Sequence, residues 1–518
     1  MSRLPLHSVR LIFFISAPVL CGLLALQLGM DGSWDLRNYH YYNGWALLTG
    51  HIGRDLLVSQ TPSFYNPLLD LPYAWAAGRF NARIIAFALG ALHGADFILL
   101  TRLAESLLAL PDPRRKLYVS ATLAAAGCAG AVGLSEVGTV FYDNVTSLGL
   151  IGTLLLLVRR WDRMAQGARF DAAKCALWAG LPLGLAFGLK QTMIPFVAGT
   201  GLALLVALPA PFARRIAVCL CFGAGLALTT LLGGGFWMVH LWHEYGNPLF
   251  PYFNEIFHSP WGLGGDYRDV YYQPKDWLHR ILFPVFFTAN SRIAAEVPFF
   301  DARVLTLFLL IPVSPLLGAH KRPRTAFLLL SIALAYVVWL KLFAIYRYLV
   351  VLEMLAPLAV MLICEGLPRR WALNGGLAVV FVLCAVTRPA QWIRMPFSEH
   401  PVAVSLPPIA DPEHSMVLIA GHEPLSFLIP AFPETMQFLR IDSTFTNPDQ
   451  TNVPFNRMMK ERIDAHQGPL LALFIPIERH DVIKRLANDG LALAPSSCGV
   501  VTSPIGASDY SLCAVARQ

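Results

Sequence analysis

Apolar stretches of about 18 or more residues recur along residues 11–388, and this repetition constrains the fold more than any other feature of the chain. A helix of that length crosses the ~30 Å hydrocarbon layer of a bilayer with all its backbone hydrogen bonds made internally. The composition agrees, because 56% of the residues are hydrophobic and 14% are charged, against roughly 25% charged in soluble domains. We therefore expect a polytopic α-helical membrane protein.

Hydropathy and the placement of basic residues together predict about eleven spans. Residues 11–29 follow Arg3 and Arg10, as the apolar part of a secretory signal would, but no small-residue cleavage site comes after them, so we interpret them as a retained first span. The predicted spans lie near 11–29, 82–108, 117–137, 144–158, 174–189, 193–209, 215–238, 302–319, 325–342, 348–364 and 371–388.

The net charge of +7 is unevenly distributed. Residues 389–518 contain nine Lys and Arg against thirteen Asp and Glu, so they carry −4 and the preceding part carries +11. The basic residues of that preceding part fall in short connections between spans, at 111–116, 159–174, 214–215, 320–324 and 368–370. If the N-terminus is cytoplasmic, all five connections face the cytosol and residues 389–518 lie on the opposite side. Charge of this kind orients a membrane protein, and no nucleic-acid partner is expected.

Two segments on the outer side, 30–81 and 239–301, are too long to be turns. The first mixes aromatic and apolar residues, which suits short helices at the membrane surface. The second is dense in Pro, Gly, aromatic and charged residues, which indicates an ordered but irregular loop. The chain is thus expected to comprise a transmembrane domain over 1–388, with these two outer loops, and a separate tail.

Residues 389–518 begin with a Pro-rich linker and continue with alternating short elements. The segments "MVLIAG", "LLALFIP" and "YSLCAVA" predict strands, while 455–466 and 478–489 predict amphipathic helices. We expect a small α/β domain on the extracytoplasmic side. Its two cysteines, Cys498 and Cys513, can form a disulfide if the domain lies outside the cytosol, and two free thiols are the alternative. The other seven cysteines fall in predicted spans, where a thiol acts as a small apolar side chain.

The first outer loop opens with "SWDLRNYHYYNGWALLTG", residues 33–50, in which Asp35, Tyr39 and Tyr42 share one face of a helix. A carboxylate at the bilayer surface, partly desolvated and surrounded by phenols, has a pKa raised toward that of a general base. With His40, the two tyrosines would then line a substrate site. The alternative is that Asp35 or Ser33 caps a surface helix whose aromatic residues form an interfacial belt.

Three further charged residues are expected at the outer ends of spans. Asp143 lies in "TVFYDNVTSLG", Lys190 in "GLAFGLKQTMIP" and Arg347 in "FAIYRYLVV". Taken singly, the acid suits a helix cap, and each cation suits a side chain that extends along the helix to reach the membrane surface. Together, two acids and two cations at one membrane face predict a site for an anionic lipid headgroup.

The order of these features resembles the GT-C class of membrane glycosyltransferases, which use polyprenyl-phosphate sugars. The resemblance rests on the acid that opens the first outer loop, in the pattern Asp35…Tyr39…Ala46-Leu47-Leu48…Gly50, and on the step "FYNPLLDLPYAWAAG". The acid in "FYDN" and the lysine in "GLAFGLK" follow in the same order and on the same side of the membrane. The resemblance spans roughly residues 10–390.

The resemblance implies that Asp35 is the catalytic base, that Asp143 is a second catalytic acid, and that Lys190 and Arg347 contact the donor phosphate. It implies transfer of a sugar to a glycan, lipid or protein acceptor on the outer face of a bacterial cytoplasmic membrane, with inversion of the anomeric carbon. The loop has no adjacent acidic pair, since three residues separate Asp31 from Asp35, which leaves open both the choice of base and a divalent metal cofactor.

The second outer loop supplies candidates for the acceptor side. Tyr245, Asn247 and Tyr252 are placed to hydrogen-bond sugar hydroxyls, and Trp261 to stack on a sugar face. The alternative is a Pro-stiffened loop that only packs on the spans. His240 and His243 are one helical turn apart, but their spacing lacks the H-E-x-x-H signature, so no metal site is assigned there.

Two rival functions remain open. A transporter or flippase of a lipid-linked sugar predicts ionisable residues in mid-span, and His93, Asp96 and Arg102 in the second span fit that description. A non-catalytic membrane scaffold presenting the tail domain is the second rival. Substitution of Asp35 by Asn separates an enzyme, which loses transfer, from a scaffold, which does not respond.

Overall fold

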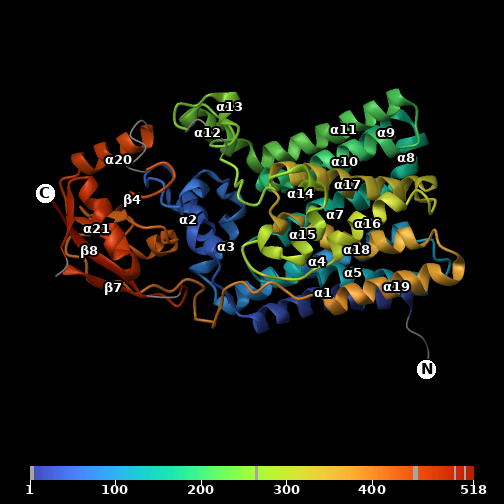
Figure 1. Cartoon of the computed structure of the whole chain (residues 1–518), viewed down its shortest axis with the longest axis horizontal. Helices are drawn as coiled ribbons and strands as arrows, with labels where there is room; N and C mark the ends of the chain where they lie inside the picture. The colour runs from blue at the N-terminus through green and yellow to red at the C-terminus, as the bar shows by residue number, and fades with distance from the viewer. Residues whose placement is uncertain (1–4, 263–266, 447–452, 495–496, 507–508) are drawn as a thin grey trace. The chain divides into compact units, whose positions relative to one another are not determined.

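The computed structural model in Figure 1 describes residues 5–262, 267–446, 453–494, 497–506 and 509–518. The chain forms two compact units, each assembled from segments that are distant in sequence. Unit 1 comprises 1–28, 87–235 and 268–392, and unit 2 comprises 29–86, 236–267 and 393–518.

Unit 1 is helical. Its longer helices are α1 (Leu6–Leu28), α4 (Ala82–Leu107, from Phe87 on), α5 (Pro113–Cys128), α7 (Asp143–Arg159), α9 (Arg169–Leu189), α10 (Ile194–Ala207), α11 (Phe212–Thr230), α16 (Arg303–Val313), α17 (Pro323–Leu342), α18 (Val350–Cys364) and α19 (Arg369–Val386). Shorter turns connect them: α6 (Ala131–Ser135), α8 (Trp161–Gln166), η4 (Gln191–Met193), η5 (Leu231–Gly235), α14 (Trp277–Ile281), α15 (Phe283–Ala289), η6 (Ser291–Ile293), η7 (Ala319–Lys321) and η8 (Tyr346–Leu349).

Each of the eleven segments predicted to span the membrane contains an α-helix, although 117–137 and 302–319 are helical over only part of their length. Six helices within the described residues are long and apolar enough to cross a bilayer: Leu6–Leu28, Ala82–Leu107, Arg169–Leu189, Phe212–Tyr245, Pro323–Leu342 and Tyr346–Cys364. Three shorter apolar helices are Gln191–Ala207, Arg303–Val313 and Arg370–Val386. The chain therefore has the helices of a multi-pass membrane protein, and the number eleven stays a prediction.

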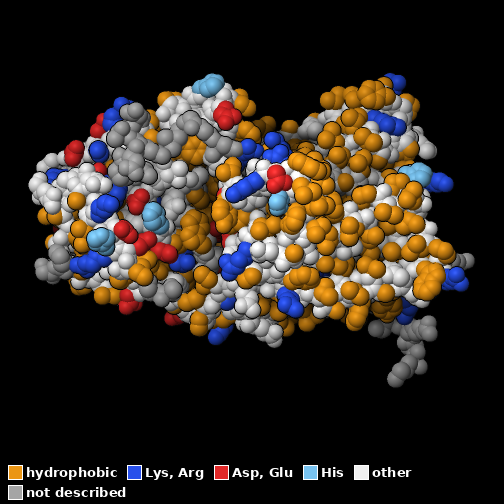
Figure 2. Space-filling view, in the orientation of Figure 1, with side chains coloured by type: hydrophobic (Ala, Val, Ile, Leu, Met, Phe, Trp, Pro, Cys, Tyr) orange, Lys and Arg blue, Asp and Glu red, His pale blue; other side chains and the backbone are white. Residues whose placement is uncertain are grey.

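The core of unit 1 surrounds α18, in which every residue is buried. Small residues let neighbouring helices approach closely, as they do in membrane proteins generally. A Cβ added to Gly127 of α5 would collide with the carbonyl oxygen of Met354 in α18, and one added to Gly184 of α9 would collide with that of Leu226 in α11. The outer surface of the unit is apolar: Figure 2 shows hydrophobic side chains over its helices, and Leu220 and Phe381 are 69% and 73% exposed. Lipid is the environment in which such a surface is stable.

Unit 2 contains the first outer segment, residues 239–267 of the second outer segment and residues 393–518 of the tail, whereas residues 268–301 belong to unit 1. Its elements are β1 (Met30–Asp31), η1 (Leu36–His40), α2 (Tyr41–Thr49), η2 (Thr61–Phe64), η3 (Pro67–Leu69), α3 (Leu71–Ala77), α12 (Phe236–Tyr245), α13 (Asn254–Phe257), β2 (Arg394–Met395), β3 (Met416–Ile419), η9 (Ser426–Ala431), β4 (Gln437–Arg440), α20 (Pro454–Ala465), β5 (Leu470–Phe474), η10 (Pro476–Glu478), α21 (Arg479–Asn488), β6 (Leu491–Leu493), β7 (Gly499–Val501) and β8 (Tyr510–Arg517). The second outer segment includes residues 263–266, which lie outside the described residues.

The tail forms a mixed six-stranded sheet in the order β4-β3-β5-β8-β6, with β7 also paired to β8. Strands β4, β3 and β5 are parallel, and β8 runs antiparallel to its neighbours. The predicted α/β character of the tail is thus confirmed, with strands at the three segments named from the sequence and helices α20 and α21 within two residues of the predicted ranges.

The first outer segment is built onto the edge of this sheet. The backbone of Leu56 pairs with Leu439 of β4, with Leu56 N donating to the Phe438 carbonyl at 2.9 Å and Arg440 N donating to the Leu56 carbonyl at 2.9 Å. The buried Arg440 guanidinium reinforces the junction by donating to the Val58 carbonyl at 3.2 Å. The loop therefore covers an edge that would otherwise be unpaired.

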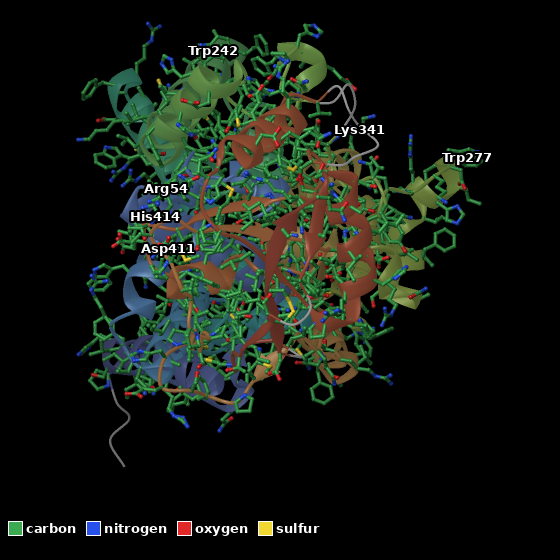
Figure 3. All side chains as sticks on the ribbon, turned by 90° about the vertical axis from the view of Figure 1, so that its left-hand side faces the viewer. Arg54, Trp242, Trp277, Lys341, Asp411 and His414 are labelled. Carbon is green, nitrogen blue, oxygen red and sulfur yellow. A yellow bond between two sulfur atoms is a disulfide. The ribbon has the colours of Figure 1, made fainter. Side chains whose placement is uncertain are left out.

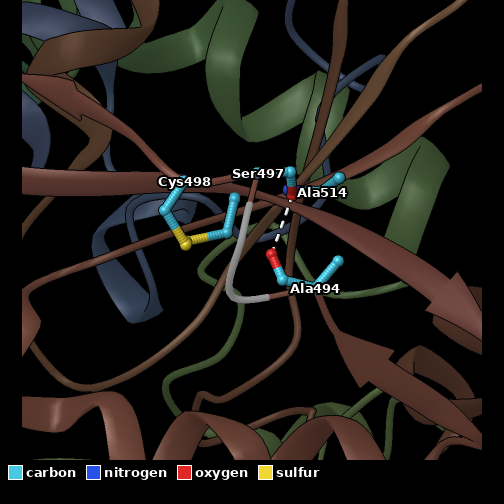
Figure 4. The surroundings of a disulfide bond; sticks show 5 residues. Ala494, Ser497, Cys498 and Ala514 are labelled. Atoms are coloured by element: carbon cyan, nitrogen blue, oxygen red, sulfur yellow. Dashed lines mark hydrogen bonds between the residues drawn. A yellow bond between two sulfur atoms is a disulfide. The ribbon is translucent and has the colours of Figure 1, made fainter.

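A disulfide joins Cys498 and Cys513 (Figure 4). It closes a loop of 15 residues between the segment before β7 and strand β8. Beside it, the Ser497 backbone N–H donates to the Ala494 carbonyl at 3.1 Å.

Candidate functional site

A cluster of charged side chains in unit 1 lies where several helices begin or end. Asp143 is the first residue of α7, and Lys190 directly follows α9. The Lys190 ammonium donates to Asp143 Oδ1 at 2.6 Å and to the Phe141 carbonyl at 2.7 Å. Both side chains are largely buried, with 14% and 6% of their surface exposed. The bond is therefore a charge-assisted hydrogen bond screened from bulk solvent.

Arg347 belongs to the same cluster. It lies on η8, with Nε 4.0 Å from Asp143 Oδ2 and Nη2 3.8 Å from Glu296 Oε1. Its guanidinium lies over the Phe141 ring, 4.4 Å from the ring centroid. Each carboxylate oxygen of Asp143 thus faces one cation. The structure brings together the three residues that the sequence predicts to share a site at the ends of spans.

Interruptions of the helices give the cluster its geometry. Tyr142, just before α7, has a left-handed backbone with φ 63°, and Ala344, just before η8, has φ 57°. Lys190 is extended, with φ −141° and ψ 110°, where α9 stops. Non-glycine residues at positive φ are uncommon and concentrate at functional sites. Each break turns a charged side chain inward at a helix end.

Glu136 is a fourth member of the environment that the sequence reasoning missed. It follows α6, is 3% exposed, and neither of its carboxylate oxygens has a hydrogen-bond partner among the described residues. Its carboxylate interacts electrostatically with Asp143, Arg347 and Lys190. The available signal was a lone acid at the end of an apolar stretch, which is a marker of function in membrane segments.

A second buried network fixes the turn that carries Glu136. Glu353 of α18 accepts from the Gly133 backbone N–H at 3.1 Å, and Asp301 accepts from the Ala131 backbone N–H at 2.9 Å. Arg303 pairs with Asp301, and both side chains are completely buried. These acids occupy the N-terminal end of α6, where unpaired backbone N–H groups favour negative charge.

Asp35 lies in unit 2, at the start of the π-helical turn η1. Its side chain makes no cap hydrogen bond, whereas Ser33 Oγ accepts from the Leu36 backbone N–H at 3.3 Å. The capping role considered for this stretch therefore belongs to Ser33. The Tyr39 hydroxyl donates to Asp35 Oδ2 at 3.1 Å, so that part of the predicted face is present. The Tyr42 hydroxyl instead donates to Asp55 at 2.7 Å. The π-helical turn between Asp35 and Tyr42 alters the spacing that an α-helix would give these two residues.

The other predicted lining residues have different surroundings. His40 Nδ1 lies 2.5 Å from Asp70 Oδ1, and both side chains are buried. Asn247 is fully buried and holds its own loop, donating to the Tyr252 carbonyl at 3.0 Å and accepting from the Leu249 backbone N–H at 2.9 Å. These contacts hold His40 and Asn247 within unit 2, and their predicted contact with substrate stays a prediction.

Two predicted lining residues do line a pocket of unit 2. Tyr42 and Tyr245 are among its walls, and Tyr65, also in the wall, shares a hydrogen bond of 2.8 Å between hydroxyl oxygens with Tyr252. The space that the pocket leaves for water-sized molecules is about 140 Å³.

The two histidines considered as metal ligands have different surroundings. His240 lines the pocket, with its ring centroid 4.7 Å from that of Trp237, whereas His243 is exposed. Among the residues that the structure describes, no group of three or more His, Cys, Asp or Glu side chains is placed to hold a metal ion.

Of the three mid-span residues named for a transporter, His93 and Asp96 form a buried pair in α4. His93 Nδ1 is 3.6 Å from Asp96 Oδ2, and His93 Nε2 is 3.0 Å from the Cys128 carbonyl oxygen. Neither carboxylate oxygen of Asp96 has a hydrogen-bond partner in the described part of the chain. Arg102 instead donates to Glu105 at 3.2 Å on the same helix.

Comparison with known proteins gave two results. No family model matches the chain, and no curated protein matches it in sequence. Among solved structures, the chain is similar to the Archaeoglobus fulgidus oligosaccharyltransferase in its apo form, with 12% identity, a TM-score of 0.49, and coverage of 92% of this chain and 71% of that one. It is also similar to the same enzyme tethered by a disulfide to an acceptor peptide containing the NVT sequon, with 12% identity, a TM-score of 0.44, and coverage of 95% and 74%.

Proposed function

We propose that this chain is a GT-C-like glycosyltransferase that transfers a sugar from a polyprenyl-phosphate donor to a glycan, lipid or protein acceptor. The observation that carries the proposal is the buried cluster in unit 1, in which Asp143 holds Lys190 and Arg347 at the ends of apolar helices. Fixed cations at helix ends suit a phosphate whose hydrocarbon tail lies in the bilayer.

In the reaction, a base removes the proton from the acceptor hydroxyl while its oxygen attacks the anomeric carbon. The bond between that carbon and the phosphate oxygen breaks, the polyprenyl phosphate leaves with the electron pair, and direct displacement inverts the anomeric centre. Asp35 takes the role of base, because Ser33 caps the helix in its place. General base catalysis contributes about 10²–10⁴-fold.

Lys190 and Arg347 stabilise the negative charge that grows on the departing phosphate. Asp143 acts as a positioning residue, since its two oxygens face the two cations. We place the protein in a bacterial cytoplasmic membrane because of its composition and its resemblance to the GT-C class. With eleven spans, the basic connections favour a cytoplasmic N-terminus and an extracytoplasmic tail.

The test uses the purified full-length protein and a panel of radiolabelled polyprenyl-phosphate sugars. We expect one donor to be broken down, Asp35→Asn to abolish this at least a hundredfold, and Asp35→Asn to bind the donor as before. Asp411→Asn is the matched control, because Asp411 is a half-exposed acid of the same unit whose only described ion pair is with His414 (Figure 3). Full activity in Asp35→Asn, or no breakdown of any donor, contradicts the proposal.

A transporter of lipid-linked sugars is the second candidate, favoured by the buried pair of His93 and Asp96 inside a membrane helix. Vesicles containing the protein distinguish the two functions. Movement of a labelled lipid-linked sugar between leaflets that is lost in Asp96→Asn and kept in Asp35→Asn supports transport. Donor breakdown that is lost in Asp35→Asn and kept in Asp96→Asn supports transfer.

A further inference from the structure

We infer that the pocket of unit 2 binds a sugar unit that carries no negative charge. The pocket lies between the first outer segment, helix α12 and helix α20, and all its lining residues belong to unit 2. The inference extends the proposed function by locating a sugar-binding site, and the binding itself does not depend on transfer chemistry.

Aromatic rings form one wall. Tyr245 packs face to face on Phe250, with ring centroids 4.8 Å apart, and meets Trp261 edge to face at 5.9 Å. Trp261 in turn lies 5.0 Å from Phe455 of α20. Rings that support one another present fixed apolar faces, and the C–H face of a pyranose is the part of a sugar that packs on such surfaces.

Two polar side chains on α12 face the same space. His240 and Glu244 are four residues apart, so they lie on one side of the helix, and both line the pocket. No hydrogen bond or ion pair of either side chain is found among the described residues, in contrast to most polar groups of the pocket floor. A carboxylate and an imidazole in that position are acceptors for sugar hydroxyls.

The floor is rigid. Asp55 Oδ2 accepts the Tyr42 hydroxyl at 2.7 Å and lies 3.0 Å from His51 Nδ1, while Asp55 Oδ1 accepts from the Phe438 backbone N–H at 3.0 Å. Burial, and then the Asp55 charge, raise the pKa of Tyr42 well above its usual range, so the phenol stays a donor to Asp55. A floor fixed in this way limits the conformational entropy lost on binding.

The charge of the lining excludes anions. The ionic residues in the wall are Asp55, Glu244 and Arg462, which sum to −1 with neutral histidines. Arg462 is engaged with backbone, donating to the Arg54 carbonyl at 2.7 Å and to the Gly53 carbonyl at 3.3 Å. A phosphate or a uronic acid would therefore be repelled by the Glu244 carboxylate, whereas a neutral or N-acetylated sugar would not.

The experiment measures binding to the full-length protein in a zwitterionic detergent without a sugar headgroup, by equilibrium dialysis and without any donor. The probes are methyl glucoside, methyl N-acetylglucosaminide, methyl glucuronide and a short neutral peptide. We expect saturable binding of a neutral probe and at least tenfold weaker binding of the glucuronide. Glu244→Gln and His240→Ala should each weaken binding about tenfold to a hundredfold.

Matched controls come from the same segment. His243 lies on α12 but outside the pocket, and Glu255 is an exposed acid of α13, so His243→Ala and Glu255→Gln should bind as the unchanged protein does. Asp35→Asn should also bind normally, which separates a failure of the catalytic proposal from a failure of this one. Absence of saturable sugar binding, binding unaffected by Glu244→Gln and His240→Ala, or preference for the peptide overturns the inference.

Discussion

Removing the carboxylate of Asp143 should expose how strongly the unit 1 cluster is coupled. The Asp143→Asn variant breaks two ion pairs. The Lys190 ammonium loses its carboxylate partner at 2.6 Å, and Arg347 loses the same carboxylate at 4.0 Å. At an effective dielectric constant of about 20, two charges 4 Å apart interact by about 4 kcal/mol. Breaking a buried pair by removing one partner costs about 3–5 kcal/mol. We expect the free energy of unfolding to fall by that amount.

A compensating substitution makes the reasoning specific. Adding Lys190→Met to Asp143→Asn removes one of the two cations left without the carboxylate, and Arg347 retains Glu296 at 3.8 Å. The double variant should therefore be more stable than Asp143→Asn alone, with a coupling energy of about 1–3 kcal/mol, as for residues in contact.

The assay is unfolding by SDS in mixed micelles, followed by tryptophan fluorescence, with donor breakdown measured on the same samples. Lys341→Met is the matched control, since Lys341 is an exposed lysine of the same unit at the end of α17 (Figure 3). It should leave stability and activity unchanged. If the free-energy changes of Asp143→Asn and Lys190→Met add up to that of the double variant within about 0.5 kcal/mol, the cluster is not coupled. Full donor breakdown in Lys190→Met would refute the role of Lys190 at the phosphate.

Two further predictions use the same unfolding assay. Replacing Cys498 and Cys513 by Ser opens a loop of 15 residues and should cost about 3 kcal/mol, with the same loss on adding reductant to the unchanged protein. Arg440→Met leaves three carbonyl groups without their guanidinium donor and should cost about 3 kcal/mol or more, whereas a surface Arg457→Met should not.

The membrane helices were predictable because lipid leaves the chain few choices. A run of apolar residues with no water to bond its backbone must be helical, and for this reason the eleven predicted segments match helices although several are interrupted. The interruptions themselves were not predictable. The left-handed residues Tyr142 and Ala344 carry no local signal, since neither is a glycine.

The tail shows where the apolar pattern fails. Strands β3 and β5 were predicted because both are buried and continuously hydrophobic. Strand β4, Gln437–Arg440, was not, because its sequence contains a glutamine and an arginine. The Arg440 side chain is nevertheless buried, since its guanidinium bonds to backbone carbonyl groups contributed by distant segments. Only the folded chain supplies those partners.

The same distinction applies to the candidate site. Asp143, Lys190 and Arg347 were found because each ends a predicted span, which is a local property. Glu136 and Glu353 were not found, because their environment is made of residues from three separate parts of the chain. The pairing of His51 with Asp55 and Tyr42 beneath the pocket was missed for the same reason.

The buried charges of unit 1 are costly for folding, and their arrangement is informative for that reason. Apolar residues of similar volume in place of a buried ion pair often leave stability unchanged or improve it, so a chain that only had to fold in lipid would gain nothing from Asp143 and Lys190. Glu353 also lies at a helix end, in the first turn of α18, but its carboxylate accepts from the Val132 and Gly133 backbone N–H groups, whereas Asp143 faces the two cations. Folding cost and unmet bonding capacity together distinguish Glu353, which holds a backbone turn, from Asp143, which we assign to positioning the two phosphate-binding cations.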